Sequence, residues 1–281
     1  MNRYLVQRLG YALLSLVALV VVIPILFVIG IIIVRGLGAI NWRFLTTMPR
    51  DGMKAGGILP AIVGTLLLAA GTALAAIPVG VGGAIYLSEY ARDTWLTRAI
   101  RLSIVNLAGI PSVVYGLFGL ALFVLFLNLG TSILAGSLTL AIMTLPVIIS
   151  TSEEALRAVP VEFRTVSASL GGTRWQGIRR IVLSQALPGI ITGIILGLLR
   201  AGGETAPILF TVAVFFLPRL PRSPFDQTMA LPYHLYVIST QVPGMPQQVQ
   251  YGTALVLLSL VLSMNLIASL TRSYFRRRRQ W

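Results

Sequence analysis

Two charged residues inside a long apolar run are the side chains in this sequence best placed to do chemistry. Arg200 and Glu204 fall within the run 188–216, with Gly202 and Gly203 between them. A charge at the centre of a membrane costs about 2.5 to 3.5 kcal/mol on insertion scales, so such residues are rare and commonly functional. The i,i+4 spacing predicts that both side chains share one helix face, where they either neutralise each other or act together on a ligand.

The chemistry that this pair suits is the recognition of an oxyanion. Arg200 offers a planar fork of donors, and Glu204 accepts a hydrogen bond from a protonated oxygen. Thr205 adds a hydroxyl, and the two glycines allow a close backbone approach or local unwinding. Ser112 and Tyr115, three positions apart in another apolar run, offer two more hydroxyls, although hydroxyls in such helices more often bond to backbone. These five residues are the candidate substrate pathway.

Several kinds of catalysis are excluded by what the sequence lacks. It has no Cys and a single His, His234, which leaves no thiolate chemistry and no multi-histidine metal cluster. Its only lysine, Lys54, lies between Met53 and Ala55, whereas a P-loop needs Gly-Lys-Ser/Thr so that the lysine reaches the nucleotide phosphates. We therefore predict that the chain is not an enzyme, has no cofactor or metal of its own, and hydrolyses no ATP alone.

The composition is typical of a membrane protein. Of the 281 residues, 56% are hydrophobic and 11% are charged, against roughly 25% charged in a soluble domain, and the mean hydropathy is +0.88. Six runs are long enough to cross a hydrocarbon core about 30 Å thick as helices: 12–34, 58–87, 104–127, 132–150, 188–216 and 252–270. Because they are continuously apolar rather than alternating, the predicted fold class is an all-α polytopic membrane protein. The first run is too long for a signal peptide and is expected to be a retained span.

The basic residues predict the orientation. With a cytoplasmic N-terminus, fifteen Lys and Arg residues fall on the cytoplasmic side and six on the external side, with Arg200 inside a span. The positive-inside rule therefore places both termini in the cytoplasm. The four arginines at 276–279 are expected to lie against anionic membrane lipids rather than nucleic acid, because the long apolar runs rule against a nucleic-acid-binding face.

The long cytoplasmic loop 151–186 reads as helix, glycine turn, helix. The pattern predicts one helix over 161–170 and a second over 173–183, with Thr173 as its N-cap and Gly171 in the turn. Trp175, Ile178 and Val182 are expected on one face of the second helix. This glycine-turn hairpin (residues 161–183) is either a lid packed on its own bundle or a docking surface for a partner.

Prolines and glycines mark further features. The external loop 217–250 contains six prolines, and its middle, 229–240, is expected to be a short interfacial segment with Tyr233 and Tyr236 at headgroup level. Pro111 is expected to kink a span. Glycines at 189, 193 and 197 form small-xxx-small steps that predict close helix packing.

Several segments together carry a family resemblance. They are GGTRW at 171–175, EEALRAVP at 153–160, RAGGETAP at 200–207, GVGGAIYLSEY at 80–90 and GIPSVVYGL at 109–117. The first two resemble the cytoplasmic EAA loop of ABC importer permeases. The third is similar to the signature of the A-type permease subunit (PstA) of bacterial phosphate importers. The resemblance spans the chain from about residue 57 to its end, with two departures: Thr165-Val166-Ser167 replaces the name-giving Glu-Ala-Ala, and Ser184 replaces a proline.

The resemblance implies a type I ABC importer permease in a bacterial inner membrane. It implies an N-terminal helix with an external loop over 1–56 and a permease core over 57–281. The implied partners are a sister permease, two cytoplasmic ATPase subunits that bind ATP and Mg, an external phosphate-binding protein and inorganic phosphate. The hairpin would seat in a groove of the ATPase, through Ser167, Ala168, Leu170, Gly171, Gly172, Thr173, Arg174 and Trp175.

On this resemblance the oxyanion at Arg200 is phosphate. Sulfate carries no proton near neutral pH, so the Glu204 carboxylate would repel it, yet would tolerate HPO4²⁻ or H2PO4⁻ and keep Arg200 from holding the anion too tightly. Two alternatives come from other classes of protein. One is an ion-coupled secondary anion transporter or channel that uses the same buried charges, and the other is a membrane scaffold without a pathway.

Overall fold

The computed structural model describes residues 3–169 and 171–277, and the described chain is almost entirely helical. One antiparallel pair of two-residue strands, β1 (Pro49–Arg50) and β2 (Ala55–Gly56), interrupts the helices. The longer helices are α1 (Arg3–Gly36), α3 (Leu59–Ile85), α4 (Trp95–Ala108), α5 (Ser112–Gly119), α6 (Ile133–Arg157), α7 (Val161–Ser169), α9 (Leu183–Gly202), α11 (Leu231–Thr240) and α12 (Gln247–Arg277). Short helices are η1 (Leu37–Ala39), α2 (Trp42–Thr46), η2 (Asp51–Met53), η3 (Tyr86–Tyr90), η4 (Leu120–Phe126), α8 (Arg174–Gly177), η5 (Ile178–Val182) and α10 (Ala206–Thr211).

The predicted all-α polytopic architecture is confirmed. Within the described residues, five helical segments are long and apolar enough to cross a membrane, and the bent pair of α4 with α5 and η4 is a sixth if it is counted as one span. A helix satisfies its own backbone hydrogen bonds, which is why continuous apolar runs fold this way in lipid. The division into 1–56 and 57–281 remains a prediction.

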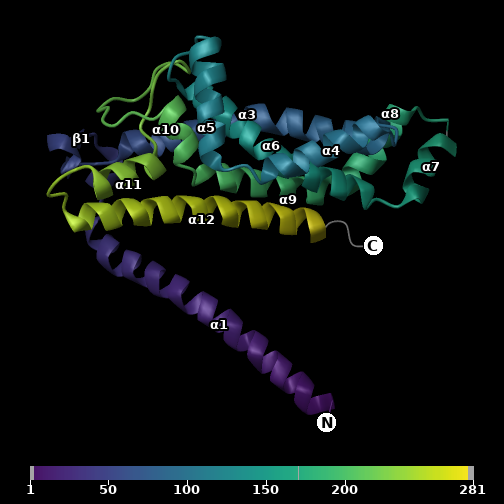
Figure 1. The fold of residues 1–281 in the computed structure, drawn as a ribbon, viewed down its shortest axis with the longest axis horizontal. Helices are drawn as coiled ribbons and strands as arrows, with labels where there is room; N and C mark the ends of the chain where they lie inside the picture. The colour runs from purple at the N-terminus through teal and green to yellow at the C-terminus, as the bar shows by residue number, and fades with distance from the viewer. Residues whose placement is uncertain (1–2, 170, 278–281) are drawn as a thin grey trace.

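Helices α3, α6 and α9 pack side by side to form the centre of the bundle (Figure 1). The predicted small-residue steps on α9 explain how α6 comes so close. A Cβ added at Gly193 would lie 1.9 Å from Oγ1 of Thr151, and one added at Gly189 would lie 2.4 Å from the Cβ of Ala155. Only glycine permits this approach, so the prediction of close helix packing is confirmed.

The prediction of one continuous span over 104–127 is wrong. α4 ends at Ala108, α5 begins at Ser112, and the two meet at 104°. Pro111 causes the break because it has no backbone N–H and disfavours helical geometry at the residue before it. The expected kink at this proline is therefore a full change of direction.

The prediction of one span over 188–216 is also wrong, at both ends. α8, η5 and α9 run together from Arg174 to Gly202, so the second helix of the glycine-turn hairpin is the beginning of the membrane helix. At the other end α9 stops at Gly202, and a separate short helix, α10, follows the break. The glycine pair lowers helix propensity at that point, as local unwinding requires.

α12 runs along one side of the bundle, and α1 lies outside it, beyond α12 (Figure 1). α1 touches α12 near its own C-terminal end, where a Cβ at Gly36 would lie 2.6 Å from the backbone oxygen of Tyr251, and then diverges from it. The N-terminal end of α1 and the C-terminal end of α12 lie toward the same end of the molecule as α7 and α8, opposite to β1 and α11.

The predicted interfacial segment 229–240 is a helix, α11, but Tyr233 does not lie at its surface. Tyr233 is buried, whereas Tyr236 is exposed. The Oγ1 atom of Thr65 accepts a hydrogen bond of 2.8 Å from the backbone N–H of Leu231, which fixes the beginning of α11 against α3. The expectation for Tyr233 is wrong because α11 packs into the bundle.

Candidate functional site

The break between α9 and α10 brings the predicted charged pair together. Glu204 lies just beyond the end of α9, where its backbone N–H donates to the carbonyl of Ala201 at 3.3 Å. The Nε of Arg200 lies 3.9 Å from Oε1 of Glu204. That separation permits attraction but exceeds a normal hydrogen bond. The two residues are therefore paired loosely at a helix break, rather than on one continuous helix face as predicted.

Both side chains remain accessible at this break. The Arg200 side chain is 35% exposed and the Glu204 side chain is 20% exposed. Thr205 immediately precedes α10, and its carbonyl accepts from Leu209 in the first turn of that helix. Glu204 also lines a small cleft whose other walls come from α3, α6 and the start of α11, including Thr65, Leu140 and Pro232. An interrupted helix inside a bundle is the arrangement in which membrane transporters commonly hold substrates.

The two candidate hydroxyls on α5 differ in availability. The hydroxyl of Tyr115 donates to the carbonyl of Leu107 at 2.8 Å, and the residue is 5% exposed. It holds α5 to the end of α4 across the bend, as the backbone-bonding alternative predicted. Ser112 is half-buried at the first position of α5. α5 itself lies against α10, where a Cβ at Gly116 would be 3.0 Å from the carbonyl oxygen of Ala206.

The glycine turn of the hairpin is formed as predicted. Gly171 has φ +72°, a left-handed conformation that side chains other than Gly and Asn rarely adopt. The N–H of Gly172 donates to the carbonyl of Ser167 at 2.9 Å and closes α7. Thr173 caps α8 with a reciprocal capping box formed with Gln176. Of the other predicted hairpin residues, Leu170 and the side chain of Ala168 lie outside what the structure describes.

The tip of the hairpin (residues 173–175) is exposed, whereas the helical segment that follows it has buried side chains. Trp175 is 51% exposed and Arg174 is also exposed, whereas Ile178 and Val182 are buried. Trp175, Ile178 and Val182 were predicted on one helix face, but they differ in exposure because Trp175 lies in α8 at the accessible beginning of the long helix. A large apolar side chain that is exposed to solvent favours a docking surface over a closed lid.

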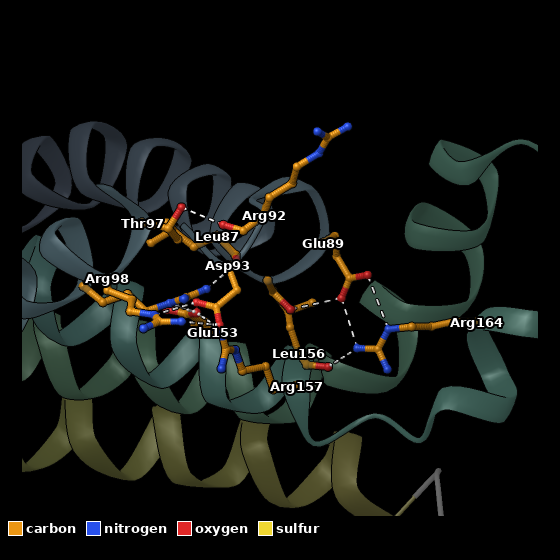
Figure 2. A network of polar contacts seen from close by, with 12 residues as sticks. Leu87, Glu89, Arg92, Asp93, Thr97, Arg98, Glu153, Leu156, Arg157 and Arg164 are labelled. Carbon is orange, nitrogen blue, oxygen red and sulfur yellow. Dashed lines mark hydrogen bonds and ion pairs between the residues drawn. The ribbon is translucent and has the colours of Figure 1, made fainter. Parts of the chain in front are cut away.

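A buried carboxylate beneath the hairpin was not selected by the sequence analysis. Glu89, in η3 at the end of α3, is 8% exposed. Arg164 of α7 donates to both of its carboxylate oxygens, at 3.3 Å from Nε and 3.0 Å from Nη2 (Figure 2). Arg174 donates to the backbone oxygen of Glu89, and its guanidinium lies 5.0 Å from the centre of the Tyr90 ring.

A second acidic residue joins the neighbouring helices. Glu153 of α6 accepts from Nε of Arg101 on α4 at 2.8 Å and pairs with Arg157 at 2.9 Å (Figure 2). Arg101 also donates to the carbonyl of Leu87 at 2.8 Å, which ties the end of α3 to this second group. The sequence signal was the presence of few acids among many arginines. Only the Glu153–Arg157 pair has a helical i,i+4 spacing, whereas Arg101 and Arg164 lie too far along the chain from their acidic partners to be paired from spacing.

Comparison with known proteins assigns the chain to a family. Residues 76–281 match the family described as "Binding-protein-dependent transport system inner membrane component". The chain belongs to this family. Its members are the permease components of ABC transporters, which confirms that this protein is an all-helical inner-membrane permease without an ATPase motif of its own. Partner ATPase and binding-protein components follow from membership in such a system.

Individual relatives agree with this assignment. The chain is 33% identical to "Probable ABC transporter permease protein YqgI" of Bacillus subtilis (strain 168), over 95% of each sequence. It is 36% identical to "Phosphate transport system permease protein PstA 1" of Mycobacterium tuberculosis (strain ATCC 25618 / H37Rv), over 93% of this chain and 85% of the relative. A solved structure of the MetNI methionine ABC transporter matches with a TM-score of 0.62 at 16% identity, covering 78% of this chain and 97% of that one, and so shares the fold.

Proposed function

We propose that this permease is the A-type subunit of an ATP-driven phosphate importer and forms half of its translocation pathway. Its partners are a sister phosphate permease, two cytoplasmic ATPase subunits that bind ATP and Mg, and an external phosphate-binding protein. The names of several similar proteins, including the Mycobacterium tuberculosis relative, specify phosphate transport, which supports phosphate as the substrate. Family membership favours this function over an ion-coupled transporter or channel and over a scaffold.

The observation that carries the proposal is the accessible Arg200 and Glu204 pair at the α9 break. A guanidinium whose nearest carboxylate oxygen is 3.9 Å away keeps donors for an anion. The carboxylate beside it accepts a hydrogen bond from a protonated oxygen of the anion, and it repels an anion that carries no proton. Monovalent and divalent phosphate carry such a proton near neutral pH, and sulfate does not.

The glycine-turn hairpin supplies the coupling to the ATPase in this proposal. Thr173, Arg174 and Trp175 form an exposed tip, and the same helix continues without interruption into α9 and reaches Arg200. A displacement of the tip is therefore transmitted along one 29-residue helical segment to Arg200. In this proposal the hairpin and both termini lie in the cytoplasm, which the distribution of basic residues supports.

Uptake of labelled phosphate in cells that depend on this importer tests the proposal. We expect uptake to persist when an uncoupler collapses the proton gradient while ATP is maintained, and to stop when ATP is depleted. Uptake that collapses with the gradient at constant ATP would support the ion-coupled alternative. Uptake unaffected by deletion of this subunit would support the scaffold alternative.

A further inference from the structure

The ion pair beneath the hairpin joins two helices that the chain itself does not connect closely. Glu89 ends α3, whereas Arg164 lies 75 positions later in α7. We propose that Glu89 is a positioning residue for coupling, which makes the end of α3 and the glycine-turn hairpin move as one body. The proposal rests on the coupling role given above and extends it from α9 to α3.

The contacts on Glu89 and its neighbour hold both halves of the hairpin. The carboxylate is held by two nitrogens of Arg164 in the first half, a fork geometry that fixes orientation as well as distance. Its backbone oxygen and the Tyr90 ring are held by Arg174 in the second half. Glu89 and Tyr90, in η3 after α3, therefore contact α7 and α8 on the two sides of the glycine turn.

Arg164 also donates to two backbone carbonyls besides the Glu89 carboxylate. Its Nη2 also donates to the carbonyl of Leu156 at 2.9 Å, and Nη1 donates to the carbonyl of Val159. These carbonyls lie at the end of α6 and just after it. Arg164 thus joins the hairpin both to Glu89 and to the last turn of α6. A displaced hairpin cannot leave the end of α3 behind without breaking a buried, charge-assisted contact.

The surroundings of this pair provide a matched control. Asp93, just before α4, and Arg98, in α4, form another bidentate ion pair, with both hydrogen bonds at 3.0 Å. Their side chains are 70% and 67% exposed, in contrast to 7% for Glu89. An exposed ion pair of this kind contributes little to the free energy of folding, and this one does not contact the hairpin. Asp93→Asn therefore removes a carboxylate four residues from Glu89 but leaves the contacts between η3 and the hairpin intact.

The first experiment measures phosphate uptake and ATP hydrolysis in the reconstituted complete complex. We expect Glu89→Gln and Arg164→Gln each to reduce phosphate transported per ATP hydrolysed by about tenfold, while ATP hydrolysis continues. The double variant should lose no more than Arg164→Gln alone, because Arg164→Gln already removes the contact with Glu89. Asp93→Asn should match the parental ratio.

A ratio within about twofold of the parental value in both single variants would overturn the proposal. So would equal losses of hydrolysis and uptake, since these indicate general damage rather than lost coupling. A parental complex that moves no phosphate at all would instead defeat the proposed function, which makes the two failures distinguishable.

A second measurement keeps the proposal testable if the variants fail to assemble. Spin labels at Tyr86→Cys in η3 and Val161→Cys in α7 report the distance between α3 and the hairpin, and both native side chains are exposed. We expect the same distance in the nucleotide-free and ATP-bound complexes. A change beyond about 3 Å between the two states would show that the hairpin moves independently of α3 and would overturn the proposal.

Discussion

At the scale of single residues, the separation between Arg200 and Glu204 determines what the pair can do. A tight, bidentate pair would occupy the guanidinium donors and leave a neutral, structural unit. The observed 3.9 Å separation, with both side chains partly exposed, leaves Arg200 attracted to Glu204 but still able to receive an anion. The residues that line the cleft beside Glu204 are mainly apolar, which strengthens any charge-assisted hydrogen bond formed there.

Replacement of Arg200 tests whether this guanidinium contacts the substrate. Arg200→Gln should lower phosphate uptake at least tenfold, because a charge-assisted hydrogen bond contributes about 1.5 to 3 kcal/mol. The complex should still assemble, as measured by co-purification of the ATPase. Arg219→Gln, which alters an exposed arginine in the proline-rich loop, is the control and should transport normally. Parental uptake by Arg200→Gln would make the pair structural.

Replacement of Glu204 tests the discrimination between anions. Glu204→Gln removes the negative charge but keeps a hydrogen-bonding carbonyl, so sulfate should lose its electrostatic penalty. We expect phosphate uptake to fall and competition by excess sulfate to become measurable. Unchanged phosphate uptake together with complete resistance to sulfate would show that the carboxylate does not select the substrate.

His234 predicts a pH dependence of stability rather than of transport. It is 2% exposed on α11, and burial lowers its pKa from 6.5 to about 4. Below pH 6.5 the unfolded chain takes up a proton that the folded chain accepts only near pH 4, so stability is lost as the pH falls through this window. Between pH 7 and pH 5 the loss is about 2 kcal/mol.

Thermal unfolding of the detergent-solubilised protein at both pH values measures this effect. His234→Gln cannot titrate in this range, so its melting temperature should fall less between pH 7 and pH 5 than that of the parental protein. Equal falls in the two proteins would show that His234 is not the group responsible.

At the scale of elements, the features that local sequence encodes were predictable, and those that depend on distant partners were not. The apolar runs predicted helices, and Gly171 with Thr173 predicted a turn and a cap, because hydropathy, glycine and capping residues act locally. The breaks at Pro111 and Gly202 lay within runs that hydropathy alone joins. The contact between Glu89 and Arg164 depends on how α3 and α7 meet in the fold, which spacing does not reveal.

The glycine turn makes a prediction of its own. Gly171 has φ +72°, and among the described residues other than its chain neighbours no atom lies within 4 Å of where a Cβ would be, so a substitution there is resisted by backbone strain. Gly171→Val should displace the tip, and both ATPase binding and uptake should fail while membrane insertion persists. Gly171→Asn is the control, because Asn tolerates this conformation, and it should retain most activity. Equal activity in both variants would contradict a role for the turn.

At the scale of the whole molecule, the bundle places its two proposed sites in one continuous path. The hairpin, the beginning of α1 and the end of α12 lie toward one end of the bundle, and α10, α11 and β1 lie toward the other (Figure 1). Arg200 and Glu204 lie at the break near the far end of the helix that begins at the hairpin tip. The architecture thus connects an exposed docking surface to an accessible charged pair.

The proposed orientation is testable because the sequence contains no cysteine. Single cysteines at Lys54 and Trp175 occupy exposed positions at opposite ends of the molecule. A membrane-impermeant maleimide added to intact spheroplasts should label Lys54→Cys, and should label Trp175→Cys only after the membrane is permeabilised. The reverse pattern would invert the orientation and contradict the placement of the hairpin in the cytoplasm.

The central claim is that this subunit couples ATP hydrolysis to the movement of phosphate. The most direct measurement is ATP hydrolysis by the complete complex in proteoliposomes, with the binding protein and either phosphate or sulfate supplied on the external side. We expect phosphate to stimulate hydrolysis and to accumulate inside, and sulfate to do neither. Hydrolysis that is the same with phosphate, with sulfate and without either anion, and without phosphate accumulation, would contradict the claim.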